Sequence, residues 1–279
     1  MPITSLSPSR AADFKRCPLL YRYRVIDRLP EPPSAAAMRG RLVHAVLQEL
    51  FGLPHRERRQ QTAQSLVPDA YQALRQQDGR LDELFLDGSL TEDSFIAEAR
   101  ALIEAYFTLE DPSRLTAAGL ELLVEAQLPG GPLLRGYIDR LEIAPASGQL
   151  RIADYKTGRI PRPAYQSEAL FQLHFYALAV SLTRGRIPHQ VLLLYLGSPA
   201  KLAAAPTPAD LERTQLKIEF IWRDIQQMVE AQDFPARQGP LCPWCSFQAF
   251  CPRFGGTLEP FPLDAASEPP QDPPAPQDP

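Results

Sequence analysis

The sequence predicts a mixed α/β protein, because segments with the periodicity of strands lie between segments with the periodicity of helices. Residues 120–128 and 133–143 flank the turn sequence PGGP, which predicts a β-hairpin. A second turn leads into a third strand over 149–158. The rest of the predicted core is a helix over 165–183, a buried strand over 189–198 and an amphipathic helix over 208–231.

The chain before the sheet is predicted to be helical. A short helix follows Ser7-Pro8-Ser9, and a longer one covers 35–51 and ends at Gly52. Residues 57–115 are rich in helix-forming side chains, and we interpret them as a helical insertion that could act as a lid or clamp. We therefore assign 1–256 to a single domain and 257–279 to a disordered, acidic, proline-rich tail.

Charge is distributed unevenly along the chain. The net charge is −4, but the tail carries five acids and no base, which leaves a net of +1 for the rest. Residues 1–60 have a net charge of +6, and such a basic arm suits a phosphate backbone, although a solvated charged surface explains the charge alone equally well. The candidate DNA-contacting side chains are Arg10, Lys15, Arg16, Arg39 and Arg41.

Several sequence signals are missing from this chain. No apolar run reaches the roughly 18 residues that cross a bilayer, and the N-terminus lacks the apolar stretch of a signal peptide. We therefore expect a soluble cytoplasmic protein. No G-x4-G-K-[ST] phosphate-binding loop occurs, so any unwinding of DNA would come from a partner helicase.

Two predicted strands end in sequences that could bind a metal, GYIDR with Asp139 and DYKTG with Asp154 and Lys156. Strand side chains alternate with period 2, so Asp154 and Lys156 share a face, and Asp139 joins them if the strands are neighbours. Mg²⁺ prefers oxygen ligands, which Asp139, Asp154 and the carbonyl of Tyr155 could supply for phosphodiester hydrolysis. Lys156 would orient or help deprotonate the attacking water, or stabilise charge on the phosphate.

The D-x-K pattern alone is common on solvated hairpins, so its companions decide the interpretation. His44 lies in the predicted helix 35–51, and Gln172 and Tyr176 lie four residues apart on one side of the helix 165–183. Each of these residues has an ordinary structural explanation by itself. Their combination and their order along the chain are far more specific.

This ordered set resembles the PD-(D/E)XK nuclease superfamily, and within it the RecB-like exonuclease branch. That branch includes the nuclease domains of bacterial helicase–nucleases and the CRISPR adaptation nucleases. The resemblance spans about residues 5–255 and implies a restriction-endonuclease-like mixed sheet flanked by helices. The matching positions are His44 in RGRLVHAVLQ, Asp139 in GYIDR, Asp154 and Lys156 in DYKTG, and Gln172 and Tyr176 in QLHFY.

The resemblance implies a Mg²⁺- or Mn²⁺-dependent exonuclease that acts on single-stranded DNA or DNA ends in repair or recombination. The implied metal ligands are His44, Asp139, Asp154 and the backbone carbonyl of Tyr155. In this interpretation Lys156 assists the attacking water, while Gln172 and Tyr176 position DNA or the lysine. Glu125, on the preceding strand, is a weaker candidate that would lie behind the ligands or in a core-facing ion pair.

The four cysteines are Cys17 near the N-terminus and Cys242, Cys245 and Cys251, spaced C-x2-C-x5-C, near the C-terminus. They could form one site that joins both ends of the chain. Zinc sites more often use two paired C-x2-C knuckles, whereas iron–sulfur clusters accept irregular spacing. Some RecB-like members hold a [4Fe–4S] cluster with one N-terminal and three C-terminal cysteines, so the resemblance implies such a clip, with structural Zn²⁺ as the alternative.

A second class of function fits part of this pattern. A non-catalytic iron–sulfur DNA-binding or assembly subunit of a repair complex would keep the basic arm and the cysteines. It would not need the carboxylates. No motif indicates cleavage polarity, strand preference or oligomeric state.

Overall fold

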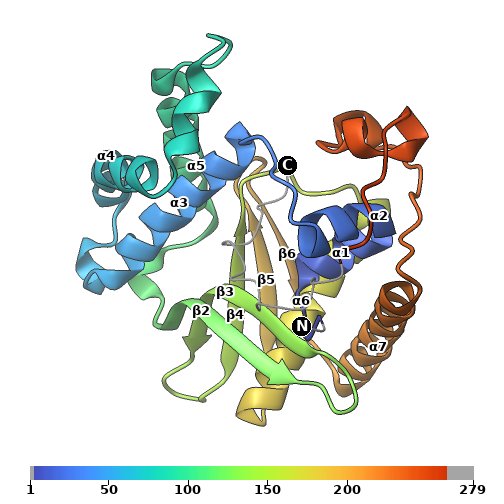
Figure 1. The fold of residues 1–279 in the computed structure, drawn as a ribbon. Helices are drawn as coiled ribbons and strands as arrows, with labels where there is room; N and C mark the ends of the chain where they lie inside the picture. Colours follow the sequence, from blue (N-terminus) through green and yellow to red (C-terminus); the bar gives the residue numbers. More distant parts are fainter. Residues whose placement is uncertain (1–2, 263–279) are drawn as a thin grey trace.

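A computed structural model describes residues 3–262, and within them a six-stranded sheet separates two groups of helices (Figure 1). On one side lie α3 (Ala35–Gly52), α4 (Gln60–Gln77) and α5 (Glu92–Leu109). On the other side lie α1 (Pro8–Arg16), α2 (Pro18–Tyr21), α6 (Gln166–Arg184) and α7 (Pro208–Ala231). The predicted mixed sheet flanked by helices is confirmed.

The strands of the sheet are β1 (Ser5–Leu6), β2 (Ala117–Gln127), β3 (Leu133–Ile143), β4 (Leu150–Lys156), β5 (Gln190–Tyr195) and β6 (Ala200–Ala204). β2, β3 and β4 are antiparallel neighbours, and α6 connects β4 to the parallel strand β5. The predicted hairpin, third strand and buried strand are confirmed. The sequence analysis missed β1, which is two residues long, and β6, a five-residue edge strand with three alanines.

Each face of the sheet is covered by its own apolar core. Ile152 of β4 and Leu193 of β5 pack with α1, α2, α6 and α7. Ala153 and Tyr155 of β4 pack with α3, α4 and α5 on the other face. β4 therefore presents alternate residues to two buried layers, as expected for a central strand.

The sheet opens between β3 and β4. These strands pair over Arg140–Ile143 and Leu150–Ala153, whereas the first residues of β3 pair with β1 instead. The alternation of β3 shifts at this point, because Ile138 and Leu141, three residues apart, pack in the same core. On β2 the neighbouring residue Glu121 has a φ of +42°, a left-handed conformation that is uncommon outside glycine. The candidate site lies at this opening.

Helix boundaries follow local signals in the sequence. The hydroxyl of Ser7 accepts the N–H of Arg10 at the start of α1, and Thr207 forms a capping box at the start of α7. α6 ends at Gly185, whose φ of +66° is left-handed. Among the described helices, none is long and apolar enough to cross a bilayer.

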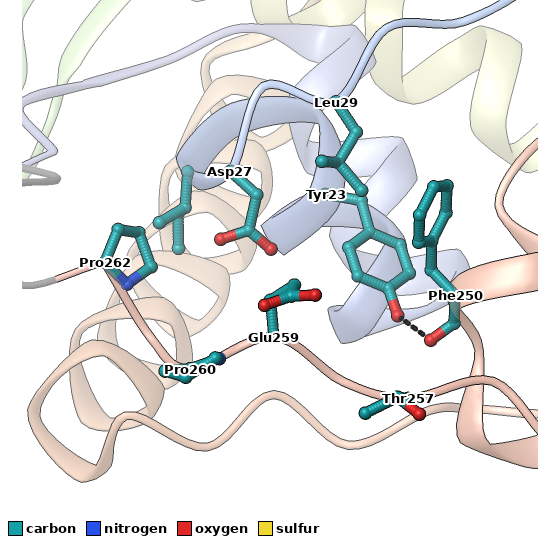
Figure 2. A pocket seen from close by; sticks show the side chains of 9 residues that line it. Tyr23, Asp27, Leu29, Phe250, Thr257, Glu259, Pro260 and Pro262 are labelled. Atoms are coloured by element: carbon teal, nitrogen blue, oxygen red, sulfur yellow. Dashed lines mark hydrogen bonds between the residues drawn. The ribbon is translucent and has the colours of Figure 1, made fainter.

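The start of the predicted tail contacts the N-terminal segment. The guanidinium of Arg22, in a π-helical turn (Arg22–Ile26), donates to the carbonyls of Glu259 and Pro260 at 2.6 and 3.1 Å. Figure 2 shows Glu259 and Pro260 beside Asp27 in a small pocket. Residues 263–279 of the predicted tail lie outside the described residues.

Candidate active site

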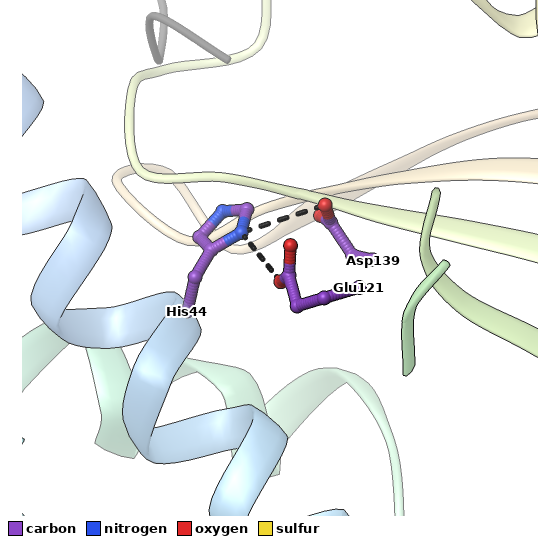
Figure 3. A group of neighbouring side chains, drawn as sticks. All are labelled: His44, Glu121 and Asp139. Atoms are coloured by element: carbon purple, nitrogen blue, oxygen red, sulfur yellow. Dashed lines mark ion pairs between the residues drawn. The ribbon is translucent and has the colours of Figure 1, made fainter. Parts of the chain in front are cut away.

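Three side chains from three different elements converge at the opening of the sheet (Figure 3). The Nδ1 atom of His44, on α3, lies 3.6 Å from Oε1 of Glu121 on β2 and 3.5 Å from Oδ1 of Asp139 on β3. Among the described residues, these three form the group of possible metal ligands whose ligand atoms all lie within 4.8 Å of one another. Nitrogen and oxygen donors at this spacing are a suitable ligand set for Mg²⁺ or Mn²⁺.

Asp139 bridges the gap between the diverging strands. Its Oδ2 atom accepts the backbone N–H of Tyr155 at 2.6 Å, while its Oδ1 atom faces His44. The carbonyl of Tyr155 lies 3.1 Å from Nε2 of His44. Both backbone groups of Tyr155 are therefore engaged by residues of the site, although β3 no longer pairs with β4 here.

Asp154 and Lys156 share a face of β4, as the period of the strand predicts. The Nζ atom of Lys156 lies 3.2 Å from Oδ2 of Asp154, and Gln172 on α6 donates from Nε2 to Oδ1 at 3.2 Å. The buried Oδ2 of Asp154 meets no well-aligned hydrogen-bond donor, so the ammonium of Lys156 stabilises it as an ion pair. A buried carboxylate is costly without such a cation beside it.

Tyr176 packs on β3 at a position that requires glycine. A Cβ atom added to Gly136 would lie 2.8 Å from Cε1 of Tyr176. The glycine of the GYIDR sequence therefore lets α6 approach the sheet closely, and this brings Gln172, on the same helix, to Asp154.

The site concentrates negative charge in a buried place. Burial raises the pKa of Asp154, the charge of Asp139 raises it further, and Lys156 and His44 only partly offset this. Burial alone would lower the pKa of His44, but Asp139 and Glu121 outweigh it and raise that pKa to about 10. The carboxylates of Glu121, Asp139 and Asp154 together carry more negative charge than Lys156 and His44 neutralise, and this excess favours binding of a divalent cation.

The donor set of His44, Glu121 and Asp139 fits a divalent metal. When bound, such an ion stabilises negative charge on a phosphate and makes water a better nucleophile. The ammonium of Lys156, held by Asp154, is available to orient water or to stabilise a phosphate oxygen.

Most predicted site residues meet at this point of the sheet. The structure brings together His44, Asp139, Asp154, the carbonyl of Tyr155, Lys156 and Gln172, with Tyr176 against the neighbouring strand. Glu125 lies elsewhere: its half-exposed carboxylate is 3.4 Å from Arg135. Glu125 does form an ion pair, but its carboxylate is exposed to solvent, so the expected core-facing pair is wrong.

The sequence analysis missed Glu121, because the register of the hairpin is not fixed by its turn sequence. The predicted strands would pair residue 128 with Leu133, whereas in the structure Gln127 faces Leu133, and this register puts Glu121 level with Asp139. A shift of one residue changes which side chains face each other. The observed register therefore identifies Glu121 rather than Glu125.

The candidate DNA-contacting residues are placed in different environments. Arg10 is buried, and Arg39 and Arg41 form ion pairs with acidic side chains of the helical layer. Lys15 and Arg16 are exposed at the end of α1. The structure therefore leaves Lys15 and Arg16 as the most accessible members of this set.

The N-terminal cysteine lies next to the segment that carries the other three. Cys17, between α1 and α2, accepts the backbone N–H of Arg237 on its sulfur at 3.3 Å. The hydroxyl of Tyr23 donates to the carbonyl of Phe250 at 2.7 Å, which ties the same two segments together (Figure 2). The four cysteines, all partly buried, form no disulfide in the structure: Cys17, Cys242, Cys245 and Cys251.

The family model of the PD-(D/E)XK nuclease superfamily matches residues 5–252, so this chain belongs to that superfamily of hydrolytic nucleases. The Gene 69 protein of Mycobacterium phage D29 is 26% identical over 289 residues, which cover 91% of this chain and 98% of that protein. The Gene 69 protein of Mycobacterium phage L5 is 32% identical over 127 residues, covering 44% of this chain and 41% of that protein.

A solved structure shares the fold. The crystal structure of a candidate exonuclease from Eubacterium rectale aligns with a TM-score of 0.58 at 15% sequence identity. The alignment covers 87% of this chain and 86% of that protein. The fold of that structure is thus shared across most of this chain.

Proposed function

We propose that this chain is a Mg²⁺- or Mn²⁺-dependent deoxyribonuclease of the RecB-like exonuclease branch that cleaves single-stranded DNA or DNA ends in repair or recombination. One observation carries the proposal. His44, Glu121 and Asp139 gather within metal-binding distance beside the Asp154–Lys156 pair. This combination of a cation site and a fixed ammonium is suited to phosphodiester hydrolysis.

In this proposal the residues have separate tasks. His44, Glu121, Asp139 and Asp154 supply the ligand atoms for the cation. Lys156 orients the attacking water or stabilises the phosphate, and Gln172 fixes the carboxylate of Asp154 that holds the lysine. Tyr176 sets the distance between α6 and the sheet.

Digestion of 5′- and 3′-labelled single and double strands tests this function. The wild type should degrade DNA in Mg²⁺ or Mn²⁺ but not in EDTA, and Lys156→Ala should lower the rate by about 100-fold or more. Lys201→Ala is the matched control, because Lys201 is exposed on the edge strand β6. DNA that stays intact with the wild type, or is cleaved equally by Lys156→Ala, contradicts the proposal.

The same preparations separate this function from a non-catalytic DNA-binding subunit. Asp139→Asn should abolish cleavage while DNA binding in EDTA stays within about twofold of the wild type, because DNA binding rests on basic side chains. If the wild type binds DNA in Mn²⁺ and never cleaves it, the non-catalytic subunit is the better account.

We also propose that the four cysteines hold a [4Fe–4S] cluster that joins the ends of the nuclease. Backbone N–H groups point at Cys17 and at Cys242, whose sulfur accepts from Gly239 at 3.3 Å, and such bonds are typical around cluster sulfurs. Within residues 3–262 no three of the cysteine sulfurs lie within 4.8 Å of one another. Tetrahedral zinc with Zn–S bonds of about 2.3 Å would need a tighter group.

Anaerobic purification tests the cluster. The protein should be brown, absorb light at about 400 nm and contain about four iron atoms per chain. Cys245→Ser should remove the colour. If the cysteines hold zinc instead, the wild-type protein is colourless and contains one zinc ion per chain. Stoichiometric zinc without iron contradicts the cluster and leaves the nuclease proposal in place.

A further inference from the structure

A fully buried arginine lies beside the candidate metal centre, on the face of the sheet that α3 and α5 cover. Arg140, on β3, donates from Nε to Glu142 at 2.7 Å and from Nη2 to Glu110, the residue that follows α5, at 2.5 Å. Its Nη1 atom donates to the hydroxyls of Tyr155 and, at 3.4 Å, Tyr106. Arg140 thus joins two strands of the sheet to the helical layer.

The charges around Arg140 are balanced. Arg151 lies 2.7 Å from Glu142 and 3.4 Å from Glu110, so two guanidinium groups face two carboxylates. The guanidinium of Arg140 also stacks over the ring of Phe51 on α3, 4.5 Å from its centroid. Buried ion pairs seldom add net stability over apolar packing, so a network of this size is better explained by a specific role.

Besides the chain link from Arg140 to Asp139, the network reaches the metal centre through the side chain of Tyr155. Tyr155 lies between Asp154 and Lys156 in the sequence, and its side chain points to Arg140 while its backbone faces the site. Its N–H donates to Asp139, and its carbonyl lies 3.1 Å from Nε2 of His44. The rings of Tyr155 and His44 also meet edge to face, with centroids 5.6 Å apart.

Near Tyr155, β4 forms no backbone ladder with β3. Pairing between the two strands ends at Arg140 and Ala153, so the backbone of Tyr155 has no ladder partner on β3. The bond from Arg140 to the phenol of Tyr155 supplies an anchor at that place. An anchored phenol fixes the peptide groups that orient Asp139 and His44.

We propose that Arg140 is a positioning residue, which holds Tyr155 so that the backbone of Tyr155 orients Asp139 and His44 for divalent-metal binding. This inference rests on the proposed nuclease function. Partners that orient metal ligands typically contribute about 10- to 100-fold to metal affinity. The effect should therefore appear in metal binding as well as in cleavage.

Two tyrosines allow a matched test. Tyr155→Phe and Tyr106→Phe each remove one buried hydroxyl that faces Nη1 of Arg140, but only Tyr155 touches the site. Binding of Mn²⁺, measured by electron paramagnetic resonance of the free ion, should weaken about 10-fold or more in Tyr155→Phe. It should stay within about twofold in Tyr106→Phe. Saturating Mn²⁺ should restore cleavage by Tyr155→Phe.

A second pair of variants tests the arginine. Arg140→Met and Arg22→Met each remove a buried, ion-paired guanidinium, but Arg22 contacts the C-terminal segment instead of the site. Both should lower stability, and only Arg140→Met should weaken Mn²⁺ binding. If Arg140→Met does not fold, the tyrosine pair decides the question.

The outcomes separate the two proposals. Wild-type protein that binds no Mn²⁺ contradicts the proposed function itself. Wild-type protein that binds Mn²⁺, with equal affinities in Tyr155→Phe and Tyr106→Phe, overturns the positioning role and leaves the nuclease assignment intact.

Discussion

Asp139 performs two tasks that substitutions can separate. Asp139→Asn removes the charge but keeps an oxygen that can accept the N–H of Tyr155, whereas Asp139→Ala removes both. Both variants lose the carboxylate beside His44 and should lose metal binding. Only the alanine variant leaves a buried backbone donor without a partner, which costs about 1–3 kcal/mol.

Unfolding in urea with EDTA measures this difference without any metal contribution. Because the two variants share the loss of charge, the difference between them isolates the hydrogen bond that bridges the opening of the sheet. We expect Asp139→Ala to be less stable than Asp139→Asn by about 1–3 kcal/mol. Equal stability of the two variants would refute the bridging role of Asp139.

Three further predictions concern the residues around this bridge. Gly136→Ala should destabilise the protein by about 1–3 kcal/mol in urea unfolding, because the new methyl group overlaps Tyr176; an unchanged midpoint would exclude this close packing. Glu121→Gln should weaken Mn²⁺ binding about tenfold while Glu125→Gln leaves it unchanged, and equal effects would argue against Glu121 as a ligand. The folded state raises the pKa of His44 to about 10, so protonated His44 should stabilise the wild type relative to His44→Gln. In urea unfolding with EDTA, this difference in unfolding free energy should be largest below pH 6.5 and disappear as the pH rises through about 10; a difference that does not change with pH would contradict this.

The strand pattern predicted the part of the site that lies on β4. Asp154 and Lys156 are two residues apart, so the period of a strand places them on one face without further information. The helix period likewise placed Gln172 and Tyr176 on one side of α6, and both contact the site region.

The remaining part of the site depends on tertiary structure. His44 lies on α3, and no local pattern indicates that this helix crosses the opening between β3 and β4; only the family resemblance pointed to it. The shift in the alternation of β3 at Asp139 breaks the rule that assigns residues to faces. The register that puts Glu121 level with Asp139 is likewise a feature of the folded hairpin, one residue away from the register that the predicted strand ends imply.

The sequence did not show which charged side chains are buried. Arg140 is surrounded by ordinary strand residues in the sequence, so nothing there indicates that it is fully buried. Arg10, which the sequence presents as part of a basic arm, is also buried. Burial of a charged residue depends on partners that come from distant segments, such as Glu110 for Arg140.

The proposed nuclease must bind Mn²⁺ and cleave DNA in the same assay. End-labelled DNA is incubated with the wild type and with Asp154→Asn, first in EDTA and then with Mn²⁺ added in excess, while bound Mn²⁺ is measured in parallel. We expect the wild type to bind Mn²⁺ and to cleave DNA only after Mn²⁺ is added, and we expect no cleavage by Asp154→Asn. Cleavage in EDTA, or intact DNA in the presence of wild type saturated with Mn²⁺, would disprove the proposed metal-dependent function.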